Sequence, residues 1–192
     1  MIQNREFPQL ETERLILREM TPDDVEFYFR HFTNDKIIEG SCFPGPKSLE
    51  TAREELERYC IKPFKEQTGI RWGIARKGID ALIGTCGFYN WNKAAYRAEI
   101  GYDLDPAFWR QGLITEALLI VFKFGFENMK LNRIQAIIDS ESTRSIQLAQ
   151  RLGFKKEGVL RQNSYFNGRF RDEFCFSLLK HELQKSQYLD SL

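Results

Sequence analysis

The chain has 192 residues, with 28 Lys and Arg against 27 Asp and Glu, so its formal net charge is +1. This length fits one domain with a substantial buried core. The near-neutral charge argues against a nucleic-acid or acidic-membrane partner. No apolar run reaches the length of a membrane span, and the first residues lack the apolar stretch of a secretory signal, so we expect a cytoplasmic protein.

The cysteines and histidines carry no motif. No two cysteines stand at a C-x-x-C spacing, so we expect neither a metal site nor a disulfide framework. His31 and His181 have no acidic partner at a motif spacing, and we expect neither to be catalytic. The sequence has no G-x-x-x-x-G-K-S/T and no G-x-G-x-x-G after a strand, which argues against nucleotide hydrolases and dinucleotide oxidoreductases. The cysteines are Cys42, Cys60, Cys86 and Cys175.

The first third of the chain predicts a strand and two helices. Residues 13–19 are expected to form the strand. Thr21, followed by proline and two aspartates, predicts a helix that runs to about residue 33. Residues 34–47 contain Gly and Pro repeatedly and predict a loop, whose apolar side chains either line a cleft or cover the core. Ser48 is the expected cap of a charged helix that runs to about residue 65.

The rest of the chain predicts a sheet interrupted by two helices. Lys77-Gly78 predicts a hairpin turn, and Asn167-Gly168 predicts another. A helix separates the strand at 133–139 from the strand before it, so the two are expected to be parallel neighbours. Gly153 is expected to end the second helix. The expected elements are strands at 70–76, 81–89, 96–104, 133–139, 154–165 and 170–179, helices at about 112–128 and 143–152, and a polar tail at 180–192.

The segment 103–117 joins the strand ending at Tyr102 to the long helix. A strand that turns sharply into a helix leaves the first helical N–H groups without backbone partners, and the helix dipole adds positive charge there. Such a turn is a ready site for a phosphate. Gly112 allows close backbone approach and Thr115 offers a hydroxyl in the first turn. The alternative is that Gly112 only relieves a tight turn.

The order of these elements, together with several short strings, resembles the GNAT N-acetyltransferases, in the branch of the ribosomal-protein acetyltransferases RimJ and RimL. The resemblance covers about residues 10–183. It implies a single α/β (α+β) domain over residues 1–192, with a mixed, mostly antiparallel sheet of six to seven strands and about four flanking helices. The strings are Glu11 to Arg18, Glu99 to Tyr102, Trp109 to Ala117, Ser145 to Phe154, Glu157 to Arg161, and Asn167 to Phe170 with Asp172.

The resemblance implies acetyl-CoA as the cofactor. In the family, a turn near Q/R-x-x-G-x-G/A binds the pyrophosphate through backbone amides. In this chain Trp109 stands at the first position of that pattern. Ile114 stands where the family has its second small residue, which is a departure from the pattern. Backbone groups of Tyr102, Asp103 and Leu104 should pair with the pantetheine arm as an added strand would. The amides expected to bind pyrophosphate belong to Arg110, Gln111, Gly112, Leu113, Ile114 and Thr115.

Acyl transfer to an amine requires a neutral amine, a donor for the oxyanion and a proton for the leaving thiolate. Glu99 lies on the strand that enters the turn and matches a family glutamate, so it is the expected base. The alternative is an ion pair with Arg97 or Arg133.

Ser145 matches the serine of the family's N-x-x-S string and is the expected proton donor. Ser142 takes the asparagine place, where it either contacts the cofactor or caps the helix. Ala149 replaces a tyrosine that many relatives carry, which leaves Tyr165 or water as other donors.

The resemblance therefore implies an enzyme that acetylates a primary amine, foremost the N-terminal α-amine of a protein. Direct attack in a ternary complex is expected, because no cysteine stands at a strand-turn-helix junction. The alternatives are a small amine (a polyamine, an amino-sugar antibiotic or an amino acid) and a non-catalytic acyl-CoA-binding module. A protein tail would need an open groove beside residues 34–47 and 163–170, and a small amine would need a closed pocket with acidic lining. The enzyme is expected to be a monomer or homodimer.

Overall fold

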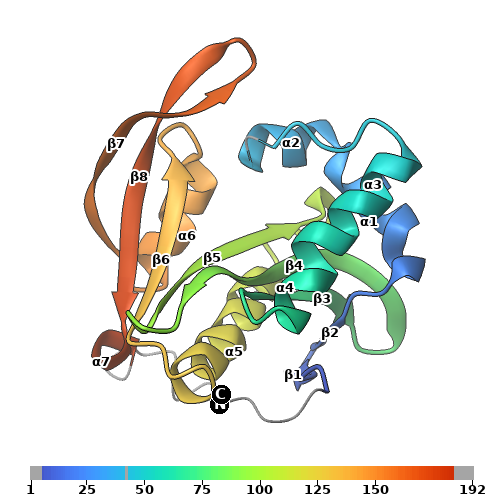
Figure 1. Ribbon diagram of the computed structural model, residues 1–192, viewed down its shortest axis with the longest axis horizontal. Coiled ribbons are helices and arrows are strands. Elements are labelled where there is room, and N and C mark those ends of the chain that lie inside the picture. The colour runs from blue at the N-terminus through green and yellow to red at the C-terminus, as the bar shows by residue number, and fades with distance from the viewer. Residues whose placement is uncertain (1–5, 42, 184–192) are drawn as a thin grey trace.

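The computed structural model describes residues 6–41 and 43–183, which form an eight-stranded sheet with helices on both faces (Figure 1). The strand order is β1-β2-β3-β4-β5-β6-β8-β7. The strands are β1 Leu10–Glu11, β2 Leu15–Glu19, β3 Ile70–Arg76, β4 Ile79–Asn92, β5 Arg97–Leu104, β6 Arg133–Asp139, β7 Lys155–Phe166 and β8 Arg169–Leu179. The helices are η1 Pro22–Asp24, α1 Val25–Phe32, α2 Asp35–Ser41, α3 Leu49–Leu56, η2 Glu57–Ile61, α4 Lys62–Lys65, η3 Pro106–Phe108, α5 Leu113–Glu127, α6 Thr143–Arg151 and α7 Lys180–Leu183.

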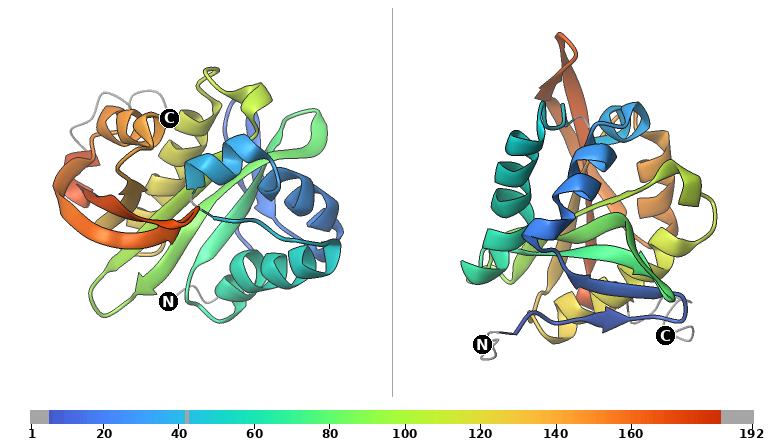
Figure 2. Two further views of the ribbon diagram at one scale, coloured as in Figure 1. Left: turned by 90° about the horizontal axis from the view of Figure 1, so that it is seen from above. Right: turned by 90° about the vertical axis from the view of Figure 1, so that its right-hand side faces the viewer.

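The core is divided by the sheet. Figure 2 shows α3 and α4 on one side of the sheet and α5 and α6 on the other. The larger apolar cluster includes Phe122 of α5 packed with Phe88 of β4 and Phe176 of β8. The smaller cluster joins Tyr28 of α1 and Leu56 of α3 to the sheet. Burying one side chain of this size stabilises the fold by about 1.5 to 3 kcal/mol. The larger cluster includes Ala98, Ile100 and Leu104 and therefore fixes the position of β5.

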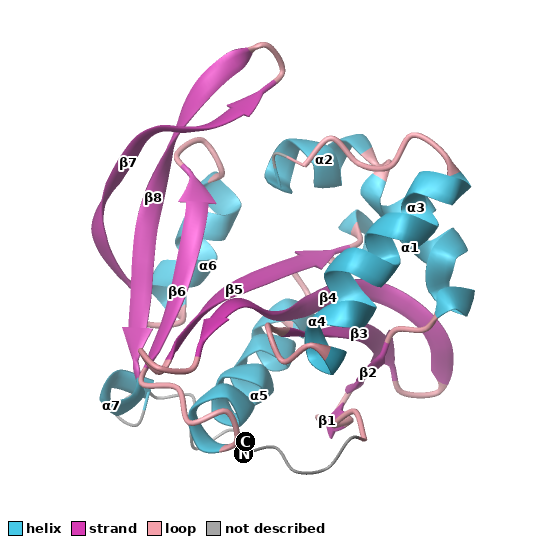
Figure 3. Ribbon diagram, in the orientation of Figure 1, coloured by secondary structure: helices cyan, strands magenta, loops and turns pink. Residues whose placement is uncertain are grey.

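The pairing of β5 with β6 is the feature that shapes the functional region. It is parallel, as expected, and joins only residues 97–99 to residues 133–135. Beyond Glu99, β5 stays paired with β4 as far as Leu104, and β6 stays paired with β8 as far as Asp139. The two halves of the sheet therefore diverge, as Figures 1 and 3 show.

Several turns form at the residues that predicted them. The Oγ of Ser48 accepts a hydrogen bond from the Thr51 amide at 3.2 Å and caps α3. Gly153 follows α6 with a φ of 87°. Asn167 and Gly168 have φ values of 48° and 78° between β7 and β8. Two successive left-handed residues match the twist of a tight hairpin, and Asn and Gly tolerate that conformation best.

Other expectations are wrong in detail. Residues 34–47 are not a loop throughout, because α2 begins after Asn34, whose Oδ1 accepts from the Lys36 amide at 3.0 Å. The tail begins with α7, whose Leu183 is buried; residues 184–192 lie outside the described chain. The sheet has eight strands rather than six or seven, because β1 pairs with β2. The described chain also has seven α-helices, where about four were expected, because several are short.

Candidate functional site

The turn before α5 presents unpaired backbone amides. Arg110 and Gly112 both have positive φ, 61° and 76°, and reverse the chain between η3 and the helix. The first helical hydrogen bond runs from the Glu116 amide to the Gly112 carbonyl at 3.0 Å. The amides of residues 113–115 precede that bond and stand at the positive end of α5, which makes an anion cradle. Ile114 packs against the larger core cluster, so its side chain leans away from the turn.

A latch of side chains from the N-terminal segment holds this turn. Glu116 of α5 accepts hydrogen bonds from the Thr12 hydroxyl, from the Arg14 amide at 2.9 Å and from Arg14 Nε at 2.7 Å. Nη1 of Arg14 also donates to the Gln111 carbonyl at 3.0 Å. Burial acts to raise the pKa of Glu116, but these hydrogen bonds outweigh it and lower the pKa. Sequence reasoning used Thr12 and Arg14 only as part of a family string, although that string marks this contact.

Beyond Glu99, no described strand pairs with the edge of β5 that faces β6, although the Leu104 carbonyl accepts from Nε1 of Trp109 at 2.6 Å. Across the paired edge, the Asp105 amide donates to the Ile83 carbonyl at 2.8 Å. Antiparallel pairs alternate between bonded and non-bonded residues. The register of β4 with β5 therefore turns the peptide groups of Leu104, Tyr102 and Ile100 toward the open edge, and that of Asp103 toward β4.

A cavity of about 580 Å³ lies on the divergence of β5 and β6. Helix α1, the segment after α2, and η2 contribute aromatic side chains to it, and the strands contribute charged and aromatic ones. The volume falls in the range of small-molecule sites. Its lining includes Tyr28, Phe32, Phe43, Tyr59, Cys60, Arg71, Tyr89, Ile100, Gly101, Tyr102, Asp103, Asp139, Ser145 and Glu173.

Asp103 is the centre of a buried polar network on the cavity floor. Its Oδ1 accepts from the Thr85 amide at 2.9 Å and lies 2.7 Å from Nε2 of His31. Its Oδ2 accepts from the Thr85 hydroxyl at 2.6 Å and from Nη2 of Arg71 at 2.6 Å. Nε of Arg71 donates to the same hydroxyl at 2.8 Å. The acidic partner that His31 lacks at a motif spacing thus comes from a strand 72 positions away.

The network fixes the charge of the cavity floor. Burial acts to raise the pKa of Asp103, but His31, Arg71 and Thr85 outweigh it and hold the pKa at about 2. Asp103 is therefore ionised at neutral pH, and each of its oxygens has two partners. Burial also raises the pKa of Cys60 to about 12, so this cavity thiol stays protonated and is a poor nucleophile.

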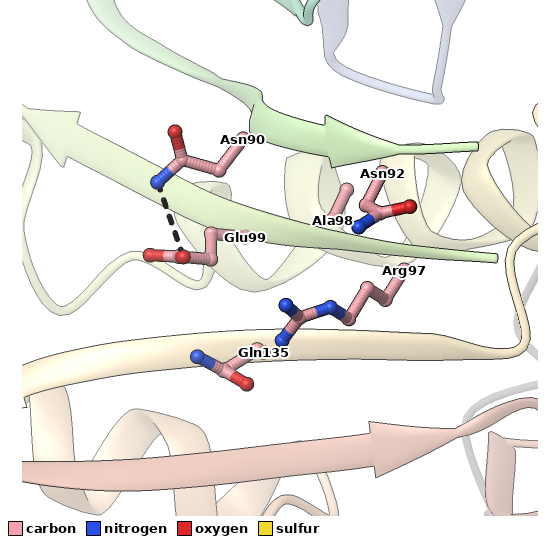
Figure 4. Close-up of a pocket in the computed structure, with 6 residues that line it drawn as sticks. All are labelled: Asn90, Asn92, Arg97, Ala98, Glu99 and Gln135. Carbon is pink, nitrogen blue, oxygen red and sulfur yellow. Dashed lines mark hydrogen bonds between the residues drawn. The ribbon is translucent and has the colours of Figure 1, made fainter. Parts of the chain in front are cut away.

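Glu99 stands where β5 leaves β6, since it is the last residue of β5 paired with that strand. Its Oε1 accepts from Nδ2 of Asn90 at 3.1 Å (Figure 4). A smaller pocket of about 250 Å³, which Glu99 lines, adjoins the cavity through Asn90. In the described chain, no ion pair joins Glu99 to a cation.

The alternative partners expected for Glu99 are wrong. Nη1 of Arg133 donates to Oε1 of Glu157 at 2.7 Å, so Arg133 belongs to a different ion pair. Figure 4 shows the Arg97 guanidinium extending toward Gln135 rather than toward the Glu99–Asn90 pair. Burial and the adjacent Glu99 carboxylate, to which the Tyr89 hydroxyl donates, raise the pKa of Tyr89. Glu99 thus has neutral partners, Asn90 and Tyr89, and no cation among the described residues.

The start of α6 faces the same cavity. Ser145 lines it, and the Ser145 carbonyl accepts from the Tyr102 hydroxyl at 3.5 Å. Burial raises the pKa of Tyr102 to about 12, so the hydroxyl keeps its proton. Ser142 occupies the N-cap position, but its side chain makes no capping hydrogen bond, so its hydroxyl does not cap the helix. Tyr165 lies at the tip of the β7–β8 hairpin, 64% exposed, outside the cavity lining.

Other features bear on the class of protein. No helix of the described residues is long and apolar enough to cross a membrane. Within the same residues, no cluster of His, Cys, Asp and Glu suits a metal ion. Cys60, Cys86 and Cys175 are free thiols.

The chain is similar to known acetyltransferases along most of its length. Residues 14–155 match the family model of the acetyltransferase (GNAT) domain. The chain is 40% identical over 174 residues to the uncharacterized N-acetyltransferase YoaA of Bacillus subtilis, covering 91% of this chain and 98% of that protein. It is 32% identical to YdaF of the same organism, provisionally named a ribosomal N-acetyltransferase, covering 88% and 93% of the two chains.

A solved structure shares the fold. The spermidine N-acetyltransferase of Vibrio cholerae, in complex with CoA and spermine, has a TM-score of 0.80 at 21% identity, covering 91% of this chain and 100% of that one. The diverging strands and the amide turn agree with the family that the family model and the relatives indicate. The chain belongs to the GNAT family, in its RimJ/RimL-like branch, and is an acetyl-CoA-dependent N-acetyltransferase.

Proposed function

We propose that this enzyme acetylates a primary amine by direct attack in a ternary complex, with the acyl donor along the open edge of β5 and the amine in the cavity. The observation that carries the proposal is the divergence of β5 from β6 immediately after Glu99, beside a cavity of about 580 Å³. A strand edge and a cavity that meet at one carboxylate bring donor, acceptor and base within reach of one another.

The residues fit coenzyme A. The amides of residues 113–115, with Thr115 in the first helical turn, would hold the pyrophosphate, and the latch on Glu116 keeps them in place. The peptide groups of Tyr102 and the amide of Leu104 would pair with the pantetheine arm, while the Leu104 carbonyl is held by Trp109; the ladder alternation favours them over Asp103. Bound acetyl-CoA supplies an activated acyl group.

Glu99 would take the proton of the attacking ammonium, directly or through one water. Its partners, Asn90 and the Tyr89 hydroxyl, are neutral and leave lone pairs for this task. The thiol of Cys60 is protonated and buried, which argues against an acyl-enzyme route. Ser145 remains the proposed proton donor to the leaving thiolate, and the protonated hydroxyl of Tyr102 is a neighbouring donor.

The proposed acceptor is the N-terminal α-amine of a protein, as the provisional name of YdaF suggests. A second candidate, a small amine, is favoured by the cavity itself. Its volume suits a small molecule, its walls include Asp139 and Glu173, and its lining includes no residue of the hairpin tip at 163–170. The name of the Vibrio cholerae relative points the same way.

Release of free thiol from acetyl-CoA, measured against a panel of peptides with free N-termini and of small amines, tests the proposal. Turnover with one acceptor class and not the other decides between the two candidates. A CoA-induced rise in melting temperature without turnover of any amine would support a non-catalytic acyl-CoA-binding module instead.

A further inference from the structure

The guanidinium of Arg71 on β3 is only partly used by its neighbours. Nε and Nη2 donate to Thr85 and Asp103, as described above. Within the described residues, Nη1 makes no hydrogen bond. The side chain is 20% exposed and lines the cavity. A charged donor with free N–H groups therefore faces the space assigned to the acceptor.

The position of Nη1 is set by Gly101 of β5. A Cβ built on Gly101 would lie 3.3 Å from Nη1 of Arg71 and 3.2 Å from Cε1 of Tyr89. The guanidinium thus occupies the space that a side chain at residue 101 would fill. The absence of that side chain lets Arg71 reach the strand along which the acyl donor is proposed to lie.

Glu99 and Gly101 are two residues apart on β5, so they share one face of the sheet, about 7 Å apart along the strand. This face therefore presents a carboxylate and, two residues further on, a guanidinium edge. The guanidinium is immobilised by its bonds to Thr85 and Asp103, so little conformational freedom is lost when it binds an anion. A planar guanidinium is well suited to carboxylates.

Resting on the proposed function, we infer that Nη1 of Arg71 binds a carboxylate carried by the acceptor. The acceptor is then an amine with an anionic group a few bonds away from its nitrogen. That chemistry occurs in a free amino acid and in a chain whose first residue is Asp or Glu. A polyamine would place only positive charge against Arg71.

Matched acceptor pairs test this assignment. The free amino-acid pair is glycine and glycinamide. The chain pair is the amidated peptides Glu-Ala-Ala and Gln-Ala-Ala, and spermidine is the cationic reference. We expect the carboxylate member of one pair to exceed its neutral partner by about tenfold or more in kcat/KM, as a charge-assisted hydrogen bond allows. The responding pair identifies the source of the carboxylate. No preference in either pair would overturn the inference.

Three variants locate the effect. Arg71→Lys keeps a charge but loses the planar edge. Gly101→Ala crowds Nη1, because the added Cβ would lie 3.3 Å from it, and removes none of the side chains of the Asp103 network. Both should reduce the carboxylate preference several-fold. Arg76→Lys, an exposed change on the same strand, should preserve it. If Arg71→Lys abolishes the CoA-induced thermal shift, its effect on acceptor preference is not specific, and the preference of Gly101→Ala becomes the test. An unchanged preference in a variant that keeps the shift would contradict the role of Arg71.

Calorimetry separates this inference from the proposed function. The carboxylate member of the preferred pair should bind to the wild-type enzyme without acetyl-CoA, and more weakly to Arg71→Lys. Binding with that pattern but without turnover would support the carboxylate site and contradict the reaction. Turnover together with equal binding of both members would support the reaction and contradict the carboxylate site.

Discussion

Two carboxylates on the same face of β5 have opposite surroundings. Asp103 is buried, and each of its oxygens has two partners from His31, Thr85 and Arg71. Glu99 lies on the same strand, at the vertex of the diverging sheet, and has only neutral partners, Asn90 and the Tyr89 hydroxyl. Side chains four residues apart on a strand point the same way, so the strand itself does not distinguish them.

Their partners decide what each carboxylate can do. A carboxylate with every lone pair engaged by charged and polar donors holds elements together and cannot readily accept another proton. A carboxylate whose partners are all neutral, beside a cavity, remains available to a substrate. We therefore propose that Asp103 positions neighbouring groups and that Glu99 takes part in the chemistry.

Asp103→Asn should have the largest effect, a loss of about 3 to 5 kcal/mol in the free energy of unfolding, because it leaves the Arg71 guanidinium without its buried counterion. Urea denaturation measures this loss. Glu99→Gln is the matched control, with an expected change within about 0.5 kcal/mol. Equal stability of Asp103→Asn and the wild type would contradict the positioning role.

Glu99→Gln should instead lower kcat by about 100-fold at neutral pH, which corresponds to about 2.7 kcal/mol, because the amide cannot accept the ammonium proton. The Kd for CoA should stay the same. Steady-state thiol release and calorimetry measure the two quantities. A variant with wild-type kcat at all pH values would remove Glu99 from the mechanism.

The third-largest effect should come from acid, which weakens the Asp103 network. The folded-state pKa of Asp103, about 2, lies below the unfolded value, so its contribution is present above about pH 4 and is lost as the pH falls toward 2. We expect the free energy of unfolding to fall by on the order of 2 kcal/mol across this window. Urea denaturation at successive pH values measures this loss. In Asp103→Asn this part of the pH dependence should disappear; its persistence would point to other carboxylates.

The latch on the anion turn should have the smallest effect. Glu116→Gln weakens the bonds to Arg14 and Thr12, and we expect CoA to bind about tenfold more weakly, a change of about 1.4 kcal/mol. Glu11→Gln is the control, because it changes exposed contacts away from the turn, an ion pair with Lys77 and a hydrogen bond from Gln9. An unaltered Kd in Glu116→Gln would show that the turn holds its shape without the latch.

Local signals in the sequence predicted most of the fold. Gly153, Asn167 and Gly168 adopt left-handed conformations that few other residues favour, so their positions marked real boundaries. The helix at Asp35–Ser41 escaped prediction because nearby glycines and prolines outweighed the cap at Asn34. Leu183 was assigned to a polar tail because its burial depends on tertiary contacts alone.

The site was less predictable because its key contacts join distant segments. The partner of His31 is 72 positions away, and Thr12 and Glu116 are 104 positions apart. No spacing rule reaches that far. The pairing of Arg133 with Glu157 likewise depends on how β6 and β7 lie across β8, which the sequence pattern does not specify.

Residue-resolved hydrogen exchange, with and without CoA, tests the central claim most directly. The claim is that the amides at the start of α5 and on the open edge of β5 bind the acyl donor. Saturating CoA should slow exchange of the amides of Leu113, Ile114, Thr115, Tyr102 and Leu104 by about tenfold or more, and leave the β7–β8 hairpin unchanged. Bound CoA that leaves these amides exchanging as before would contradict it.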